Sequence, residues 1–193
     1  MLHTLEEMHR IYGWKFAGSG YRSSMVVEEP PVGAEPHPEI SRCFATSYSN
    51  GQRQLTIDLV KAGLPEWLLD HIRPRIIVSE LVAPRWDCAS VYKMKAQLLG
   101  AGQEFYQNIA AEPFRELEKQ WQQWTNPAHW ERVEVVFDNY PAGIRTIGVI
   151  SSGHDMQGWR GNYGSKFANL QIRVEIPDEF RWLTDEDISG EDS

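Results

Sequence analysis

Residues 137–174 read FDNYPAGIRTIGVISSGHDMQGWRGNYGSKFANLQIRV. Two apolar runs begin in this stretch, 144–150 and 170–176, and both are typical of half-buried β-strands. The loop between them contains Trp159 among four glycines, at positions 153, 158, 161 and 164. Glycine accepts positive φ and lets a ligand approach the backbone. The stretch therefore predicts two strands joined by a glycine-rich loop that displays a tryptophan.

The two-residue period of a half-buried strand recurs upstream. It predicts further strands over 54–59, 74–82, 90–99 and 131–137. Turn signals separate these runs at 50–51, 100–102 and 140–143. Many short strands separated by turns indicate a mainly β chain that folds as an antiparallel sandwich or barrel.

Two segments show helical spacing instead. Residues 64–72, LPEWLLDHI, place Pro65 where a helix tolerates proline, in its first turn. Residues 113–124 carry Phe114, Leu117, Trp121 and Trp124 at i, i+3, i+7 and i+10. This stripe predicts an amphipathic helix that packs its tryptophans into the core of the sandwich. Residues 28–40 hold four prolines and predict an extended loop, and residues 1–12 are compatible with a short helix.

Composition limits the classes of function. The formal net charge of −8 repels phosphate backbones, so a nucleic-acid partner is not expected. The first ten residues lack the apolar core of a signal peptide, and no run approaches the ~20 apolar residues that cross a bilayer. We therefore expect a cytoplasmic protein in which Cys43 and Cys88 are buried free thiols.

Catalytic and metal-binding patterns are absent from the sequence. The six histidines show neither HxxxH nor HxH spacing, and there is no GxSxG, P-loop or GxGxxG motif after a strand. We therefore expect a binding protein that has no catalytic residues and uses no metal ion or cofactor.

The ordered motifs of the chain resemble the F-box-associated (FBA) domain of the sugar-recognising F-box proteins. The C-terminal part of the resemblance rests on Phe137, Tyr140, Gly143, Arg145, Gly153, Asp155, Trp159, Gly161, Tyr163, Gly164 and Asn169. The upstream part rests on Gly13-Trp14-Lys15, residues 44–48, 57–59, 64–70, 73–74 and 76–78, Asp87-Cys88 and Tyr92. The resemblance thus covers about residues 13–177.

The resemblance implies a two-sheet antiparallel β-sandwich of the galactose-binding-domain type, a jelly roll with one or two short helices. It also implies a ligand, the inner chitobiose of high-mannose N-linked glycans, bound by loops at one end of the sandwich. Such a domain selects glycoproteins for a ubiquitin ligase. The alternative function is a protein–protein adaptor on the same fold without affinity for glycans.

The family's ligand-binding residues carry over individually. Trp159 matches its stacking tryptophan, against the alternatives of a core or a protein-contact residue, and Arg160 matches the basic residue beside it. Tyr48 corresponds to an aromatic loop residue of the pocket. Asp87 and Asn169 are the remaining matches. Gly158 departs from the pattern, because the sugar binders have a tyrosine there, and its absence removes stacking surface.

The resemblance divides the chain into an N-terminal extension (1–12), an F-box-associated domain (13–178) and an acidic tail (179–193). An F-box needs several tens of residues, and only 12 precede Gly13. The sequence therefore predicts an excised domain or an F-box-less member, similar to the non-specific cytotoxic cell receptor proteins. A ubiquitin-ligase adaptor is an expected partner only if a longer native chain carries an F-box.

Overall fold

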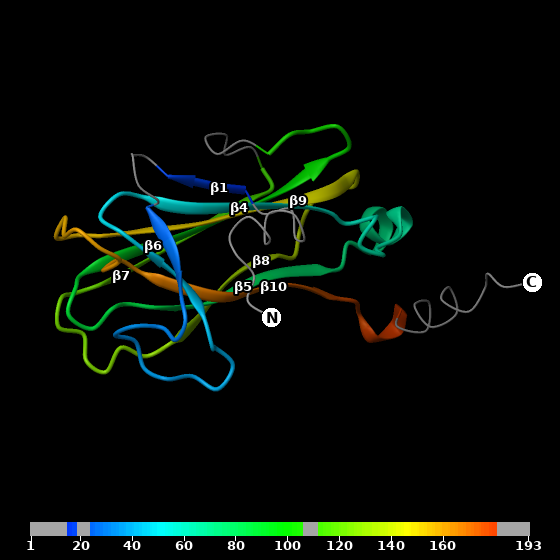
Figure 1. The fold of residues 1–193 in the computed structure, drawn as a ribbon. Coiled ribbons are helices and arrows are strands. Elements are labelled where there is room, and N and C mark those ends of the chain that lie inside the picture. Colours follow the sequence, from blue (N-terminus) through cyan, green and yellow to red (C-terminus); the bar gives the residue numbers. More distant parts are fainter. Residues whose placement is uncertain (1–14, 19–23, 106–111, 181–193) are drawn as a thin grey trace, which may run out of the picture.

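The protein is a β-sandwich of two antiparallel five-stranded sheets (Figure 1). The structure, a computed structural model, describes residues 15–18, 24–105 and 112–180. The first sheet has the order β1 (Lys15–Gly18), β4 (Gly51–Asp58), β9 (Ile144–Asp155), β6 (Ser90–Gly100) and β7 (Phe114–Trp121). The second has the order β2 (Met25–Glu28), β3 (Cys43–Thr46), β10 (Lys166–Glu175), β5 (Arg75–Ala83) and β8 (Glu131–Phe137). The predicted two-sheet sandwich is confirmed.

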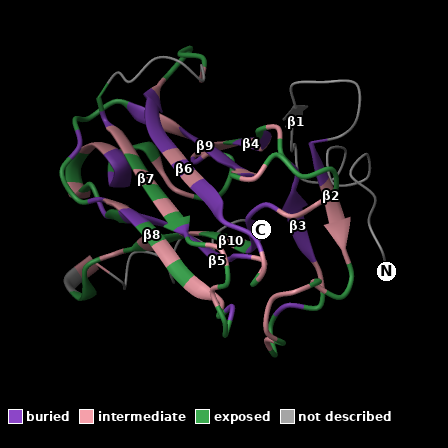
Figure 2. Ribbon diagram, turned by 90° about the vertical axis from the view of Figure 1, so that its left-hand side faces the viewer, coloured by how far each residue is buried: buried purple, intermediate pink, exposed green. Residues whose placement is uncertain are grey.

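The core lies between the two sheets, where alternate residues of each strand point inward. In β5, Ile76, Val78 and Val82 enter the core and face side chains of β6 and β9. Buried residues therefore line the interior of the sandwich, while the exposed ones lie on its outer faces and loops (Figure 2). The two predicted free thiols, Cys43 and Cys88, are buried, and burial raises the pKa of Cys43 to about 12.

The predicted helix over 113–124 is wrong, because most of this segment is strand β7. It pairs with β6 from Gln97↔Phe114 to Ser90↔Trp121. Trp121 is buried as expected, but Trp124 lies beyond the strand and is 62% exposed. Leu117 and Trp121 are four residues apart, a spacing that fits both a helix and one face of a strand. Pairing with β6 overrides the helix-favouring Glu, Lys and Gln residues of this segment.

The helix predicted over 64–72 is present in a shorter form, η1 (Leu68–Ile72), and a second short helix is η2 (Asp178–Phe180). The four-residue strands β1, β2 and β3 were not predicted. The predicted helix over 1–12 lies outside the described residues, as does the predicted tail beyond Phe180. No helix among the described residues is long and apolar enough to span a membrane.

The proline-rich loop between β2 and β3 packs on the outer face of the second sheet. Its Ile40 forms a small apolar cluster with Cys43, Leu81 and Ala168, against which Trp130 packs. The Trp130 indole N–H also donates to the carbonyl of Glu35 at 2.9 Å. The loop is thereby fixed to the sheet.

A buried carboxylate connects the two sheets. Glu80 of β5 has no exposed surface and accepts hydrogen bonds from Tyr92 Oη at 2.5 Å and Ser151 Oγ at 2.6 Å, both in the opposite sheet. Arg53 of β4 forms an ion pair with the same carboxylate and lies 4.5 Å from the centroid of the Phe44 ring. Burial lowers the pKa of Arg53 to about 9. A buried charge needs such partners to be tolerated.

Helix η1 is attached to β9 by a second carboxylate. The Asp70 carboxylate accepts hydrogen bonds from the two terminal guanidinium nitrogens of Arg145, at 2.9 and 2.8 Å. It also accepts the backbone N–H of Gly143 at 2.7 Å. These hydrogen bonds hold the pKa of Asp70 well below its usual range. The unfolded chain takes up a proton near pH 4 while the folded carboxylate stays charged, so this stabilisation is lost as pH falls below about 4.

We expect Asp70→Asn to lower the urea midpoint of unfolding at pH 7, and the difference from the parent protein to shrink at pH 2.5. Urea denaturation at both pH values measures this. Glu66→Gln is the matched control, because Glu66 pairs with the same guanidinium from an exposed position and should change the midpoint little. An equal difference at both pH values would contradict the assigned role of the Asp70 carboxylate.

Candidate functional site

Four loops meet at the end of the sandwich opposite η1, at the left of Figure 1. They are 47–50 between β3 and β4, 84–89 between β5 and β6, 122–130 between β7 and β8, and 156–165 between β9 and β10. Backbone hydrogen bonds join three of them: Asp155 N–H to Ser47 O at 2.9 Å, Met156 N–H to Ala89 O at 2.8 Å, and Gly164 N–H to Thr46 O at 2.8 Å. This end faces the viewer in Figure 2.

Asp155 and two glycines shape the loop that carries Trp159. The buried Asp155 carboxylate accepts the backbone N–H groups of Gln157 at 2.9 Å and Gly158 at 2.6 Å. Gly158 and Gly161 have φ of 70° and 129°, conformations that side chains beyond glycine rarely adopt. These turns place Trp159 at the surface, where its side chain is 39% exposed.

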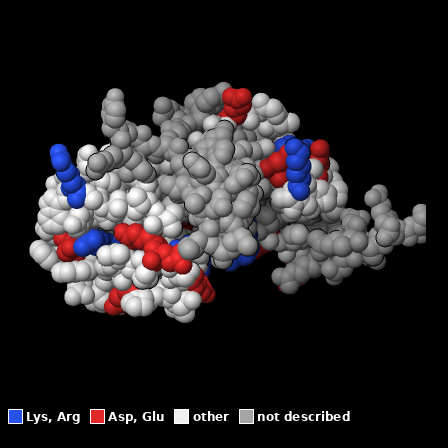
Figure 3. Space-filling view, viewed as in Figure 1, with Lys and Arg blue, Asp and Glu red and all other residues white. Residues whose placement is uncertain are grey.

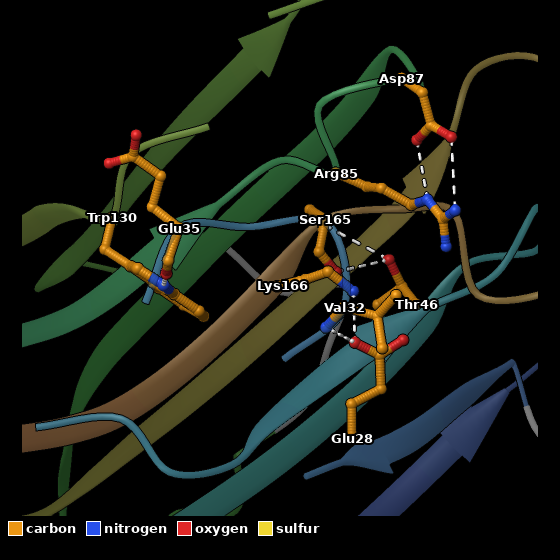
Figure 4. Close-up of polar contacts among 9 residues, drawn as sticks. All are labelled: Glu28, Val32, Glu35, Thr46, Arg85, Asp87, Trp130, Ser165 and Lys166. Atoms are coloured by element: carbon orange, nitrogen blue, oxygen red, sulfur yellow. Dashed lines mark hydrogen bonds and ion pairs between the residues drawn. The ribbon is translucent and has the colours of Figure 1, made fainter. Parts of the chain in front are cut away.

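Neighbouring side chains hold the Trp159 ring in one orientation. Tyr163 contacts it in a T-shaped arrangement with centroids 5.5 Å apart. The Arg85 guanidinium lies 4.4 Å from the Tyr163 centroid and forms a bidentate ion pair with Asp87 at 2.7 and 3.3 Å (Figure 4). Aromatic and cation–π contacts of this kind restrict the motion of a ring in the free protein. Less conformational entropy is then lost when a ligand binds. Trp159 is therefore a preorganised, partly exposed aromatic surface.

A polar network lies beneath the loops and fixes their ends. Lys166, which is fully buried, pairs with Glu28 at 2.5 Å, and the same carboxylate oxygen of Glu28 accepts the Val32 N–H at 2.9 Å. The Thr46 hydroxyl donates to the Ser165 carbonyl at 2.9 Å. Figure 4 shows these contacts beside the Arg85–Asp87 pair. The network connects β2, β3 and β10 at the point where the Trp159 loop returns to the sheet.

The structure places five of the six predicted site residues on these loops. Gly158, Trp159 and Arg160 are exposed on the β9–β10 loop, and Tyr48 is 54% exposed on the β3–β4 turn. Asp87 lies on the β5–β6 loop, where Arg85 already binds its carboxylate.

Asn169 lies apart from the other candidates, at the bulge in β10 between Ala168 and Gln171. Its φ of 53° is a conformation that asparagine tolerates better than most residues, and its side-chain amide donates to the Glu39 carbonyl at 2.9 Å. These contacts give Asn169 a role in the bulge and in holding the proline-rich loop.

The backbone at Gly158 explains part of its departure from the family pattern. A Cβ at this position would meet nothing within 4 Å, so space is available for a side chain. A tyrosine at φ 70° would nevertheless be strained. The φ of Gly158 therefore favours glycine at this position, and the missing ring leaves a smaller stacking surface.

Sequence reasoning missed an exposed pair of tryptophans at the same end. Trp86 of the β5–β6 loop and Trp124 of the β7–β8 loop have ring centroids 5.5 Å apart and are 40% and 62% exposed. The signal available in the sequence was a tryptophan between Arg85 and the candidate Asp87, together with the polar segment 122–126, QQWTN. The helical reading of 113–124 hid the second of these.

The described residues show no field of one charge on the face drawn in Figure 3 and no metal-binding cluster. On the part of that face that is not grey, acidic and basic side chains lie close together. Within the residues that the structure describes, no group of three His, Cys, Asp or Glu side chains could hold a metal ion.

The family model described as the F-box associated region matches residues 6–174. The chain belongs to this family. This confirms the predicted resemblance. F-box only protein 6 of Rattus norvegicus is 35% identical over 160 residues, which cover 80% of this chain and 54% of that protein. F-box only protein 6 of Homo sapiens is 37% identical over 139 residues, 72% of this chain and 45% of that protein. F-box only protein 44 of Mus musculus is 32% identical over 142 residues, which cover 74% of this chain and 53% of that protein.

The FBA chain spans about half the length of these curated relatives. Among solved structures, TmCBM61 in complex with β-1,4-galactotriose is similar with a TM-score of 0.46 and 13% identity, covering 84% of this chain and 88% of that one. The CBM22-1 xylan-binding domain from Paenibacillus barcinonensis has a TM-score of 0.39 and 10% identity, with 84% and 86% covered. Similarity this weak gives no information about what this chain binds.

Proposed function

We propose that this FBA domain is a non-catalytic recognition module whose loop end binds the inner chitobiose of N-linked glycans through Trp159. The observation that carries the proposal is the exposed Trp159 ring, which packs against Tyr163 in a T-shaped arrangement. It lies on a loop whose turns are formed by glycines. Such a ring packs against the C–H face of a sugar, while neighbouring polar groups bind the sugar's hydroxyls. Arg160 and Tyr48 are the exposed neighbours that we assign to this second task.

In a longer chain that carries an F-box, the domain would select glycoproteins for a cytoplasmic ubiquitin ligase. The relatives named F-box only proteins 6 and 44 support this setting. The chitobiose core of a glycan lies against folded protein, so its recognition by the domain would favour misfolded glycoproteins as substrates.

A protein–protein adaptor is the second candidate function, and Gly158 favours it. Without a side chain at this position the stacking surface is smaller than the family pattern implies. Exposed Met156 and Trp124 add apolar surface of the kind that protein partners bury. The two functions differ in whether a free sugar binds.

Calorimetric titration with chitobiose separates the two functions. We expect saturable binding at millimolar sugar or below, and we expect Trp159→Ala to weaken it at least fivefold, the loss of about 1 kcal/mol of stacking. Trp67→Ala is the matched control, because Trp67 is also partly exposed but lies at the opposite end of the sandwich. Absence of heat at millimolar chitobiose would refute glycan binding and leave the adaptor.

A further inference from the structure

The Trp86–Trp124 pair is an exposed aromatic surface that the Trp159 site does not use. Its two rings come from different loops and are inclined at 49° to each other. Trp86 is held by a backbone hydrogen bond from its N–H to the Gly33 carbonyl at 3.0 Å. The pair is therefore positioned by the fold, although neither ring is buried in the core.

Trp124 has a backbone conformation that its size does not favour. Its φ is 66°, a region that bulky residues rarely enter, and its side chain is the most exposed of the large apolar side chains that the structure describes. Burial of the ring does not offset this strain. Strained residues that persist at an exposed position are a recognised mark of functional sites.

The pair lies beside the Trp159 site along the chain. Trp86 follows Arg85 directly, and the Arg85 guanidinium stacks on Tyr163, which in turn contacts Trp159. The β5–β6 loop therefore contributes Arg85 to the surroundings of Trp159 and Trp86 to the tryptophan pair.

The chain segments around Trp124 and Trp159 have similar chemistry, whereas Trp86 lies between Arg85 and Asp87, whose charges pair with each other. Trp124 lies in QQWTN, with amides and a hydroxyl and no charge, and Trp159 lies in QGWRGN, with amides and a single charge. Amide and hydroxyl groups beside an aromatic face are suited to the hydroxyls and C–H faces of sugars. A surface for a charged peptide segment would present ionic groups of one sign instead.

We infer that Trp86 and Trp124 form a second saccharide subsite, which contacts sugar units beyond the chitobiose held at Trp159. This inference rests on the proposed function and extends it, because it assigns the domain an oligosaccharide ligand longer than a disaccharide. Trp124 supplies the exposed face of the subsite, and Trp86 fixes the angle of that face.

The test compares chitobiose with the core pentasaccharide of N-linked glycans, which adds three mannoses to it. Calorimetry on the full chain should show the pentasaccharide binding about fivefold to tenfold more tightly. Trp124→Asn should abolish this gain and leave chitobiose affinity unchanged. Asparagine tolerates positive φ, so the melting temperature of this variant should not fall. Trp86→Ala should weaken pentasaccharide binding in the same way, and Trp67→Ala should change neither affinity.

Three outcomes would overturn the second subsite without refuting sugar binding by the domain. Chitobiose that binds through Trp159, with no gain for the pentasaccharide, would remove the second subsite and leave the proposed function intact. A Trp124→Asn protein that keeps the gain would show that other residues hold the additional sugars. Equal weakening of both sugars would place the disaccharide itself on Trp124. Binding of neither sugar to the parent protein is a different result, which refutes the proposed function and the subsite with it.

Discussion

Glu80→Gln is expected to lower the free energy of unfolding by about 3–5 kcal/mol, a large part of the stability of a domain of this size. The Glu80 carboxylate is fully buried and binds Arg53, Tyr92 and Ser151 at once. Glutamine keeps the shape but removes the charge that balances the Arg53 guanidinium between the sheets. Urea denaturation followed by far-ultraviolet circular dichroism measures the loss.

The matched control for this prediction is Glu118→Gln on β7. Glu118 pairs with Lys93 at 2.6 Å on the outer face of the first sheet, where both side chains are more than a third exposed. Exposed pairs of this kind contribute about 0.2–1 kcal/mol. Similar losses for the two variants would contradict the view that the Glu80 network is a major connection between the sheets.

Glu28→Ala is expected to cost about 3 kcal/mol, because it leaves the fully buried Lys166 ammonium without its carboxylate. It also removes the acceptor of the Val32 N–H, and with it one attachment of the proline-rich loop. Chemical denaturation gives the stability change. Limited proteolysis should in addition show faster cleavage between β2 and β3.

The control for Glu28→Ala is Lys166→Met, which removes the charge of the other partner in the ion pair. It removes the buried charge itself, while Glu28 keeps the Val32 N–H and a partly exposed position. We expect roughly half the cost or less, and a double variant that is more stable than the sum of the single losses implies. Strict additivity of the two substitutions would show that the side chains are not energetically coupled.

The strands that could be predicted from the sequence are those whose two faces differ. Strands β4, β5, β6, β8, β9 and β10 alternate apolar and polar residues or are rich in β-branched ones, and all six were found. The four-residue strands β1, β2 and β3 are too short to show a period. Strand β7 was mistaken for a helix because Leu117 and Trp121 fit both periods, and only pairing with β6 decides between them.

The candidate site was predictable where a single loop carries it. Trp159 and its glycines are adjacent in sequence, and the structure gives that loop the turns that its glycines allow. The contact between Trp86 and Trp124 joins residues 38 positions apart on two loops, so no local pattern announces it. Asn169 matched a family position, but its place in the β10 bulge depends on a register shift that the sequence does not show.

Sugar binding on the Trp159 ring can be tested most directly by nuclear magnetic resonance. A titration of the labelled protein with chitobiose follows the indole N–H signals of its eight tryptophans. We predict that the Trp159 signal shifts in a saturable manner, while the signals of Trp67, at the opposite end, and of the buried Trp121 stay in place. A Trp159 signal that does not move at millimolar chitobiose would show that this ring does not bind the sugar.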